Sequence, residues 1–397
     1  MTELQCVESR IASFQKKLAE KNIDVAIVTK PTDIYHFSLF NPVVQSMQSY
    51  MIIPREGEAK LLLHALRGPH AYKESPIRQE NILCYAKWGT TPSLSMDPME
   101  ALKIVIDSYK LTKPVIGAET GALSYNDYGK ICAKLGVDRL EDVTELISWE
   151  KLVKDELAID RLIKAADLAN EGMNAMIAAL KDRASEIEAA NASVAKVLDV
   201  WKNKYPEYEL CGFGTSEEQV VMGLPIGVSS CDRIAFGADA PRAYVPQKGD
   251  LVLPIVITTL GGYSIENERS LYVEELDDYK TKIFETVLEA HEKAMAAVKP
   301  GITFAQIFDV AANVFIDRGF EQFMPGRIGH GMGLALHEWP SVAKGSDMKV
   351  EAGMVFTIEP GIMNVAFGGV RPSDTVLVTE DGYRNLTNTV NGMLKIG

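Results

Sequence analysis

The sequence predicts an α/β (α+β) protein of two domains, and two observations support this. The chain has 397 residues, which is long enough for two domains that each bury a core. Strand-like and helical stretches alternate before residue 150, whereas long helical stretches and a strand pair follow it. We therefore expect a smaller N-terminal α/β domain over 1–150 and a larger domain over 151–397.

The N-terminal domain is expected to begin with a helix that leads into a strand. Apolar residues recur at helical spacing from Val7 to Leu18, and the apolar run Val25-Ala-Ile-Val28 follows. No catalytic group of residues is visible in this domain. Further strands are predicted at 50–53, 60–63 and 115–117, and further helices at 98–109 and 124–135.

The larger domain is expected to open with helices. Residues 149–180 are a helix-rich stretch whose apolar residues from Leu162 to Leu180 lie on one side, and Ser185 and Thr303 each begin a capping-box sequence that starts a further helix. A further helix is predicted around 283–298, where His291 lies on the apolar face and is interpreted as a core histidine.

Two strands are predicted next, at 251–258 and 263–273, around a Leu-Gly-Gly turn. Because side chains alternate along a strand, Glu266 and Glu268 should point the same way. We interpret this pair as functional, and the alternative is that the two carboxylates lie on a solvated face of the strand. Arg269 has the simpler alternative of an ordinary surface charge.

Bulk composition excludes several classes of protein. A net charge of −13 disfavours nucleic-acid or anionic-membrane partners. No stretch approaches the roughly 18 apolar residues that a membrane span needs, and no secretory leader is apparent, so a cytoplasmic location is expected. The five cysteines are widely spaced, as expected for free thiols in a reducing compartment.

Residues 324–381 carry the densest set of chemically active side chains. His330 has a glycine on each side, which would let the backbone turn sharply and expose the imidazole. His337 and Glu338 lie just before a proline. Glu359 ends an apolar run, so it is predicted to be a carboxylate at the exit of a buried strand that needs a partner. Together these signals indicate a site.

The order of these motifs resembles the creatinase, prolidase and aminopeptidase P superfamily. The matching pieces are Gly-His-Gly-x-Gly-Leu, His-Glu-x-Pro, Ile-Glu-Pro-Gly and Gly-Val-Arg-x-x-Asp, with Gly-Asp-Leu-Val-Leu and Gly-Tyr-x-x-x-x-x-Arg upstream. The resemblance covers roughly 155–390. It implies a pita-bread C-terminal catalytic domain, a smaller creatinase-type N-terminal domain and a homodimer.

The resemblance also implies where metal ligands would lie. Family members that cleave Xaa-Pro bonds hold two divalent ions with five ligands, and these positions are here Ile255, Glu266, His330, Glu359 and Ser373. Isoleucine cannot bind a metal and serine is a weak neutral ligand, so a dinuclear centre is not expected. We therefore predict no cofactor. The alternative is one divalent ion, such as manganese or zinc, on Glu266, His330 and Glu359.

The sequence resembles the metal-free creatinase branch more closely than the metal-dependent peptidases. By this resemblance Glu268 and Glu359 would hold a cationic substrate group, with His330 in the glycine-flanked position. Creatinase has a general-base histidine upstream, but Ala238 takes that position here. Creatine itself is therefore not an expected substrate.

Another residue must then act as the base. His337 is the first candidate because imidazole titrates near neutral pH, and Asp239 and Glu266 are the others. The predicted catalytic residues are His337, His330, Glu268 and Glu359. The predicted substrate-binding residues are Glu266, Arg371, Tyr263 and Glu338.

The leading functional prediction is a metal-independent hydrolase that cleaves a C–N bond in a small, polar, nitrogen-bearing compound. The first alternative is an Xaa-Pro dipeptidase or aminopeptidase with a reduced metal site. The second is a pseudoenzyme that binds a ligand or partner, although the charged side chains kept at the site argue against it.

Overall fold

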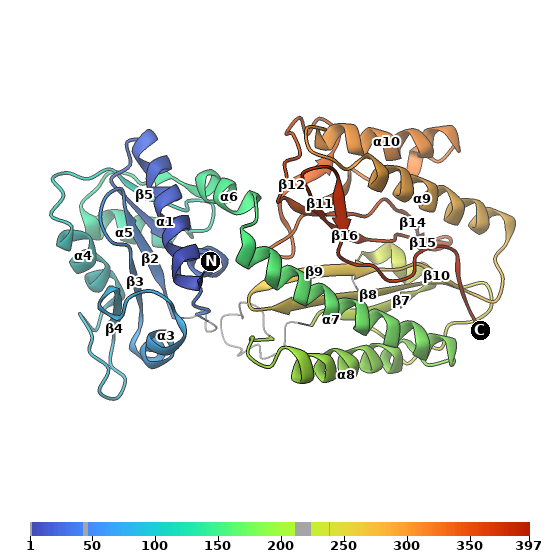
Figure 1. Cartoon of the computed structure of the whole chain (residues 1–397), viewed down its shortest axis with the longest axis horizontal. Helices are drawn as coiled ribbons and strands as arrows, with labels where there is room; N and C mark the ends of the chain where they lie inside the picture. Colours follow the sequence, from blue (N-terminus) through green and yellow to red (C-terminus); the bar gives the residue numbers. More distant parts are fainter. Residues whose placement is uncertain (1, 43–46, 211–223, 238) are drawn as a thin grey trace. The chain divides into compact units, whose positions relative to one another are not determined.

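A computed structural model describes residues 2–42, 47–210, 224–237 and 239–397 (Figure 1). The chain separates into two compact units, and the division falls between Lys151 and Leu152. The predicted mixed α/β class is confirmed.

The N-terminal unit is one mixed sheet with helices packed around it. The strand order is β4-β3-β2-β1-β5-β6, with β1 antiparallel to β2 and parallel to β5. All four residues of β1 are buried, which explains its unbroken apolar sequence. The strands are β1 (Val25–Val28), β2 (Tyr50–Pro54), β3 (Lys60–His64), β4 (Ile82–Tyr85), β5 (Ile116–Ala118) and β6 (Glu141–Asp142). The helices are α1 (Glu3–Glu20), α2 (Pro31–Ser38), α3 (Gly68–Glu74), α4 (Pro98–Ser108), α5 (Tyr125–Leu135) and α6 (Thr144–Leu152).

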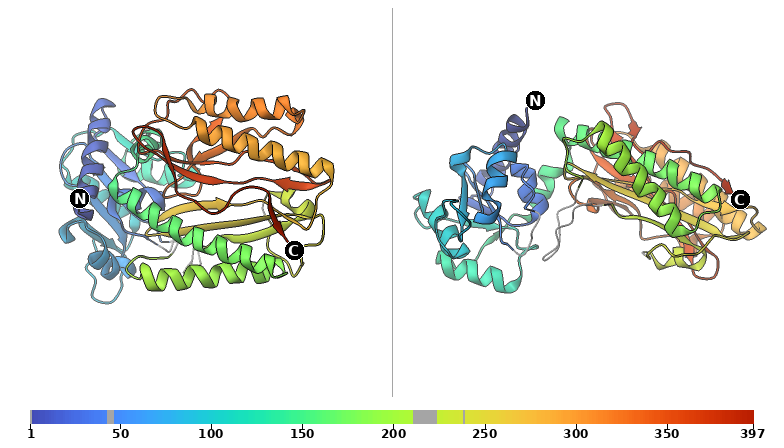
Figure 2. Two further views of the ribbon diagram at one scale, coloured as in Figure 1. Left: turned by 45° about the vertical axis from the view of Figure 1, so that its right-hand side comes forward. Right: turned by 90° about the horizontal axis from the view of Figure 1, so that it is seen from below.

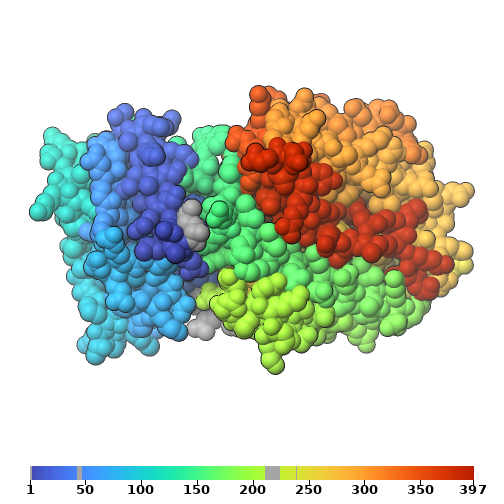
Figure 3. Space-filling view, in the orientation of Figure 1, coloured from blue at the N-terminus to red at the C-terminus, as the bar shows by residue number. Residues whose placement is uncertain are grey.

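In the second unit, helices lie on two sides of the sheets (Figures 1 and 2). On one side are α7 (Glu156–Lys181) and α8 (Glu186–Lys204), and on the other are α9 (Asp278–Ala297) and α10 (Phe304–Asp317). The predicted capping boxes are present at Ser185 and Thr303. Buried residues of α9 and α10 form one apolar core with the sheet beneath them. The C-terminal residues lie on the surface between these two sides (Figure 3).

Two larger sheets lie between the helices. The first has the order β18-β10-β8-β7, with β9 also paired to β8, and the second has the order β12-β11-β13-β16-β17. The strands of the first sheet are β7 (Ile226–Ser230), β8 (Leu251–Leu260), β9 (Tyr263–Glu268), β10 (Leu271–Val273) and β18 (Leu394–Ile396). Those of the second are β11 (Arg327–Gly331), β12 (Glu338–Ala343), β13 (Val355–Ile358), β16 (Asp374–Val378) and β17 (Tyr383–Asn385). A small ribbon pairs β14 (Ile362–Asn364) with β15 (Gly368–Val370).

One contact between the two sheets positions the site. The backbone N–H groups of Glu268 and Ser373 each donate to the other residue's carbonyl, both at 3.1 Å. This bridge joins the end of β9 to the start of β16. Residues more than a hundred positions apart in sequence are therefore neighbours.

Arg269 corrects two expectations. The single strand predicted over 263–273 is in fact β9 and β10, and the break falls at this arginine. Its side chain is fully buried and contacts Asp374 Oδ1 at 2.7 Å, so the surface-charge interpretation is wrong. A buried guanidinium needs several acceptors, and backbone carbonyls, including those of Glu268 and Ser373, supply the others.

The helix-rich stretch predicted over 149–180 contains the end of α6 and most of α7. Asp155 begins α7 by accepting a hydrogen bond from the Ala158 N–H at 2.9 Å. His291 is a buried core residue as predicted, and its Nε2 lies 3.2 Å from Asp374 Oδ2.

Two bulk predictions bear on the described residues. No helix in the described ranges has the length and apolar character to cross a bilayer. Cys6, Cys84, Cys132 and Cys231 are free thiols, and Cys211 lies outside the described residues.

Candidate active site

The candidate site is a cavity of about 570 Å³ in the second unit. Its volume falls within the range of about 300–1,000 Å³ that is typical of small-molecule sites. One wall is the first sheet, and the opposite wall comes from β11, the loop after it and the residues that follow β13. Its charged lining residues are Asp239, Glu266, Glu268, Arg327, His337, Glu359 and Arg371.

The sheet wall places carboxylates beside aliphatic groups. Across the β8–β9 pair, Ile255 lies opposite Glu268 and Ile257 lies opposite Glu266. All four side chains line the cavity, as does Leu253 two residues earlier on β8. The prediction that Glu266 and Glu268 share one face is therefore confirmed.

His330 lies on β11 with its side chain only 1% exposed, so the predicted exposed imidazole is wrong. The neighbouring glycines serve close packing of strands instead of a turn. A Cβ on Gly329 would lie 2.0 Å from the Thr357 carbonyl oxygen on β13. Only glycine lets β11 approach β13 this closely, and this approach brings His330 next to Glu359, which follows β13.

The tautomer of His330 follows from its hydrogen bond. Nδ1 lies 3.1 Å from the Gly331 carbonyl oxygen, which can only accept, so Nδ1 carries the proton. Nε2 then presents a lone pair. This nitrogen is buried and has no hydrogen-bond partner among the described residues.

The lone pair of His330 faces two carboxylates. Nε2 lies 3.8 Å from Glu266 Oε2 and 3.5 Å from Glu359 Oε1. Burial lowers the pKa of His330 to about 4, so the ring is neutral at pH 7. Three possible ligand atoms therefore lie close together, and a cation among them would favour the ionised form of both carboxylates.

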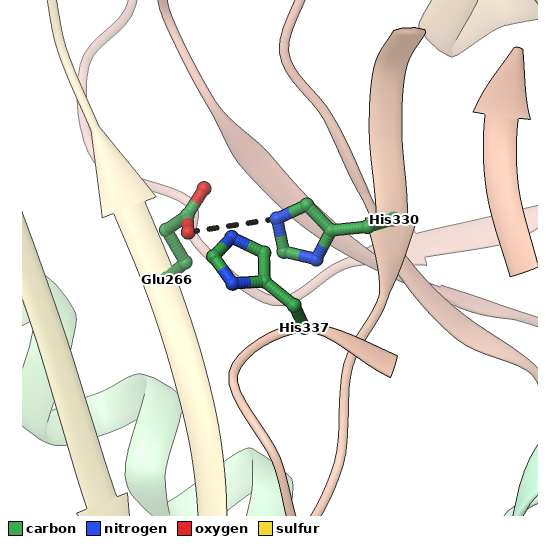
Figure 4. Close-up of side chains that lie close together, drawn as sticks. All are labelled: Glu266, His330 and His337. Carbon is green, nitrogen blue, oxygen red and sulfur yellow. Dashed lines mark ion pairs between the residues drawn. The ribbon is translucent and has the colours of Figure 1, made fainter. Parts of the chain in front are cut away.

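His337 lies beside this cluster and is exposed to the cavity. Its ring centroid is 4.3 Å from that of His330, and both rings lie near the Glu266 carboxylate (Figure 4). Ligand atoms of Glu266, His330 and His337 all lie within 4.8 Å of one another. Burial and the nearby His330 lower the pKa of His337, so this ring is also neutral at pH 7.

Glu338 supports the loop that carries His337. Its Oε2 accepts from Lys154 Nζ at 3.1 Å and its Oε1 accepts from the Ala335 N–H at 3.1 Å. A Cβ on Gly333 would lie 2.6 Å from Glu338 Oε2. The buried ion pair and the missing side chain together fix the loop next to the cavity.

Arg371 and Glu268 form a bidentate ion pair. Arg371 Nε donates to Glu268 Oε2 at 2.7 Å and Nη2 donates to Oε1 at 2.6 Å. Gly361 leaves the space that this requires, since a Cβ there would lie 2.9 Å from the Arg371 side chain. Both oxygens of Glu268 are therefore occupied, and the Nε and Nη2 atoms of Arg371 already donate to a carboxylate of the protein.

The carboxylates of the site are hard to ionise without added positive charge. Burial raises the pKa of Glu359 well above its usual value, and the charges of Glu266 and Glu268 raise it further. Burial also raises the pKa of Glu268 to about 7, although Arg371 opposes this.

The residues present fit one divalent ion but not two. His330 Nε2, which has no hydrogen-bond partner among the described residues, lies 3.8 Å from Glu266 Oε2 and 3.5 Å from Glu359 Oε1. Two sets of residues have ligand atoms within 4.8 Å of one another, and they are Glu266 with His330 and His337, and Glu266 with Glu268 and Glu359. Ile255 adds an apolar wall, and Ser373 Oγ donates to Glu266 Oε1 at 2.8 Å, so it serves the carboxylate. A second ion would lack both of these ligands.

Most of the predicted site residues meet at this cavity. Glu266, Glu268, His337, Glu359 and Arg371 line it, and the Nε2 atom of the buried His330 lies 3.5 Å from Glu359 Oε1.

Two predicted substrate-binding residues lie elsewhere. Tyr263 is 2% exposed at the start of β9 and is not among the cavity-lining residues, and Glu338 is held by Lys154. Their positions therefore favour structural roles. Ala238, the position of the missing histidine, lies outside the described residues, while the alternative base Asp239 lines the cavity and pairs with Arg233.

Arg327 was missed by the sequence analysis although it lines the cavity. The pairing of β11 with β12 is irregular between Arg327 and His330. Two residues an odd number of positions apart would normally face opposite sides, and a bulge removes that alternation. Sequence periodicity alone could not show this.

Models of two protein families match the chain. The metallopeptidase family M24 model matches residues 160–380, and the creatinase/prolidase N-terminal domain model matches residues 10–153. The first match and the carboxylate–histidine cluster contradict the prediction of no metal cofactor. The predicted hydrolase class is supported, but the finer creatinase-like, metal-independent prediction is not.

Individual relatives extend over the whole chain. The Xaa-Pro dipeptidase of Pyrococcus furiosus is 27% identical over 98% of this chain and 100% of its own length. The solved prolidase from Pyrococcus furiosus has a TM-score of 0.75 at 27% identity and covers 95% of this chain and 99% of its own. An Xaa-Pro dipeptidase structure from Bacillus anthracis has a TM-score of 0.82 at 21% identity, with 98% and 100% covered, which shows a common fold. The chain therefore belongs to metallopeptidase family M24 and carries a creatinase/prolidase-type N-terminal domain.

Proposed function

We propose that this protein is a peptidase that binds a single divalent cation and hydrolyses small dipeptides of the Xaa-Pro type. The observation that carries the proposal is the unpartnered Nε2 of His330, which faces Glu266 and Glu359 at 3.8 and 3.5 Å. The names of the relatives suggest the substrate class.

The charges of the site support one ion in place of two. With all three carboxylates ionised, Glu266, Glu268 and Glu359 carry three negative charges, and Arg371 neutralises one of them. One divalent ion balances the remaining two. A second ion would leave two uncompensated positive charges in a buried region, which is costly.

Glu266, His330 and Glu359 would hold the ion. Such an ion polarises a carbonyl group and lowers the pKa of a bound water. His330 is prepared for this role because Nδ1–H donates to the Gly331 carbonyl, which fixes the ring and directs the Nε2 lone pair to the ion.

His337 is the candidate for proton transfer. Its ring is neutral at pH 7 and lies at the open side of the cluster, so it can accept a proton from an attacking water and return it to the leaving amine. Lys154 and Glu338 keep its loop in place. The apolar residues of the sheet wall exclude water from one side of the substrate.

Metal analysis and a peptide panel test this proposal. We expect about one manganese or zinc ion per chain by elemental mass spectrometry, and metal-dependent hydrolysis of Xaa-Pro dipeptides in preference to Pro-Xaa dipeptides. Glu359→Gln should lose both the ion and the activity, while Glu285→Gln on the exposed surface of α9 should keep both. Hydrolysis that persists in metal-stripped protein, or a panel without a cleaved dipeptide, would contradict the proposal.

A further inference from the structure

Residues 386–391 connect β17 to the last strand, and buried polar side chains anchor them. This segment is neither helix nor strand. Two of its threonines are nevertheless buried, Thr387 with 0% and Thr389 with 8% of its surface exposed. Buried hydroxyl groups need hydrogen-bond partners. The partners come from β9 and β16, the two strands whose ends form the bridge beside the site.

The first contact falls on the face of β9 that is turned away from the cavity. Glu266 and Glu268 line the cavity, so Asn267 between them faces the opposite side. Asn267 is fully buried, and its Nδ2 donates to Thr389 Oγ1 at 3.2 Å. The segment 386–391 therefore lies behind the strand that presents the site carboxylates.

Arg269 links the segment to the bridge between Glu268 and Ser373. Its Nη1 donates to the carbonyl oxygens of both bridge residues, at 2.7 and 3.0 Å. Its Nη2 donates to the carbonyl oxygens of Thr387 at 2.5 Å and Thr389 at 3.2 Å. Because the guanidinium is planar and rigid, this one side chain fixes the segment relative to the bridge.

Thr387 is also connected to Glu266, through the start of β16. Its Oγ1 donates to Asp374 Oδ1 at 2.7 Å and accepts from the Thr375 N–H at 3.0 Å. Thr375 Oγ1 donates to the Glu266 carbonyl oxygen, and Ser373 Oγ donates to Glu266 Oε1, both at 2.8 Å. The first residues of β16 thus hold both the backbone and the carboxylate of Glu266, and Thr387 holds those residues from behind.

We propose that the segment 386–391 positions the site carboxylates and that Thr387 is a positioning residue. The segment acts through β9 and β16, since none of its residues is among the described residues that line the cavity. The effect on catalysis rests on the proposed function, but the positioning of the two strands does not. A misplacement of about 1 Å in a catalytic site costs about 100-fold in rate, so such a support matters for activity.

Hydrogen exchange in the metal-free protein tests the positioning. NMR with ¹⁵N-labelled glutamate and serine follows the two bridge amides, those of Glu268 and Ser373. Thr387→Val keeps the side-chain shape and removes the hydroxyl. Both bridge amides should then exchange about 10-fold faster relative to the glutamate amides of α9, the effect of losing about one hydrogen bond. Thr387→Ser keeps the hydroxyl and should restore the wild-type rates.

Manganese titration by calorimetry tests whether a loosened bridge affects the site. We expect about 10-fold weaker binding in Thr387→Val and nearly wild-type binding in Thr387→Ser. Thr286→Val is the matched control, since Thr286 is also fully buried but its hydroxyl donates within α9, to the Lys282 carbonyl oxygen at 2.6 Å. This variant should match the wild type at the bridge amides and in manganese affinity.

Four results would overturn the positioning role. They are unchanged bridge exchange in Thr387→Val, faster bridge exchange with unchanged manganese affinity, no recovery in Thr387→Ser, and the same changes in Thr286→Val. Failure of the proposed function is distinct from these. If the wild type binds no manganese and cleaves no Xaa-Pro dipeptide, the proposed function is wrong, and bridge exchange in the Thr387 variants alone decides the positioning role.

Discussion

Under the proposed function, two side chains, Ile255 and Ser373, limit the protein to one metal ion, and substitution of both should reverse this. In the double variant Ile255→Asp with Ser373→Glu, two carboxylates join the three already present. With Arg371 still bound to Glu268, four negative charges are left for the metals to balance. We expect the number of bound ions to rise from one to two.

The structure gives the size of the effect on stability. Ile255 is directly opposite Glu268, and such cross-strand Cβ atoms lie about 5 Å apart. Two carboxylates at this distance repel by about 3 kcal/mol at an effective dielectric constant of about 20. A glutamate at 373 faces Glu266 in a similar way. The metal-free variant should therefore be less stable than the wild type by several kcal/mol.

Bound metal should recover this loss. Each ion at a free concentration of about 100 times its Kd stabilises the folded state by about 2.7 kcal/mol. For a domain of this size the wild type should then gain about 5–10 °C in Tm with one ion, and the double variant about twice that with two.

Elemental mass spectrometry after dialysis, together with calorimetric titration of manganese, measures the number of ions. Thermal unfolding with and without metal measures the stabilisation. The matched control is Ile255→Asn with Ser373→Gln, which has nearly the same size but adds no charge and should still bind one ion. Two ions in the wild type, or one ion in the charged double variant, would refute the charge argument.

Three further predictions concern buried charges. Arg371→Met should destabilise the protein by about 3–5 kcal/mol in urea unfolding, since it leaves Glu268 buried and unpaired, and adding Glu268→Gln should recover part of the loss. Lys154→Met should also destabilise the protein, because it removes the cation that contacts the buried Glu338 carboxylate at 3.1 Å, and an unchanged urea midpoint would show that this ion pair does not hold the His337 loop. Burial works to raise the pKa of Asp374, but its partner cations outweigh it and hold this pKa well below the usual value. The stabilisation that ionised Asp374 provides is therefore fully present above about pH 4 and is lost as the pH falls further. Asp374→Asn should lower the free energy of unfolding by about 2–3 kcal/mol at pH 7, and the free energy of unfolding of this variant should depend less on pH below about pH 4.

The sequence alone determined the fold class and most of the site. Periodicity and capping boxes located the helices because those signals are local. Motif order identified the superfamily, and strand alternation placed Glu266 and Glu268 on one face. The same motif order showed that Ile255 and Ser373 occupy two positions where the Xaa-Pro-cleaving members of the superfamily have metal ligands. The prediction of no metal cofactor that was drawn from them was wrong, because the chain belongs to a metallopeptidase family and the structure contains a carboxylate–histidine cluster.

Only the tertiary structure decided how the charges are paired. Arg371 was predicted as a substrate-binding residue, and the structure shows that it pairs with Glu268. Arg269 was given a surface alternative but lies fully buried. Arg327 was overlooked, because a strand irregularity turns it to the cavity. Side-chain partners across two sheets depend on approach distances that no local pattern encodes. The orphaned Nε2 of His330 is likewise visible only once the two carboxylates from β9 and the end of β13 stand beside it.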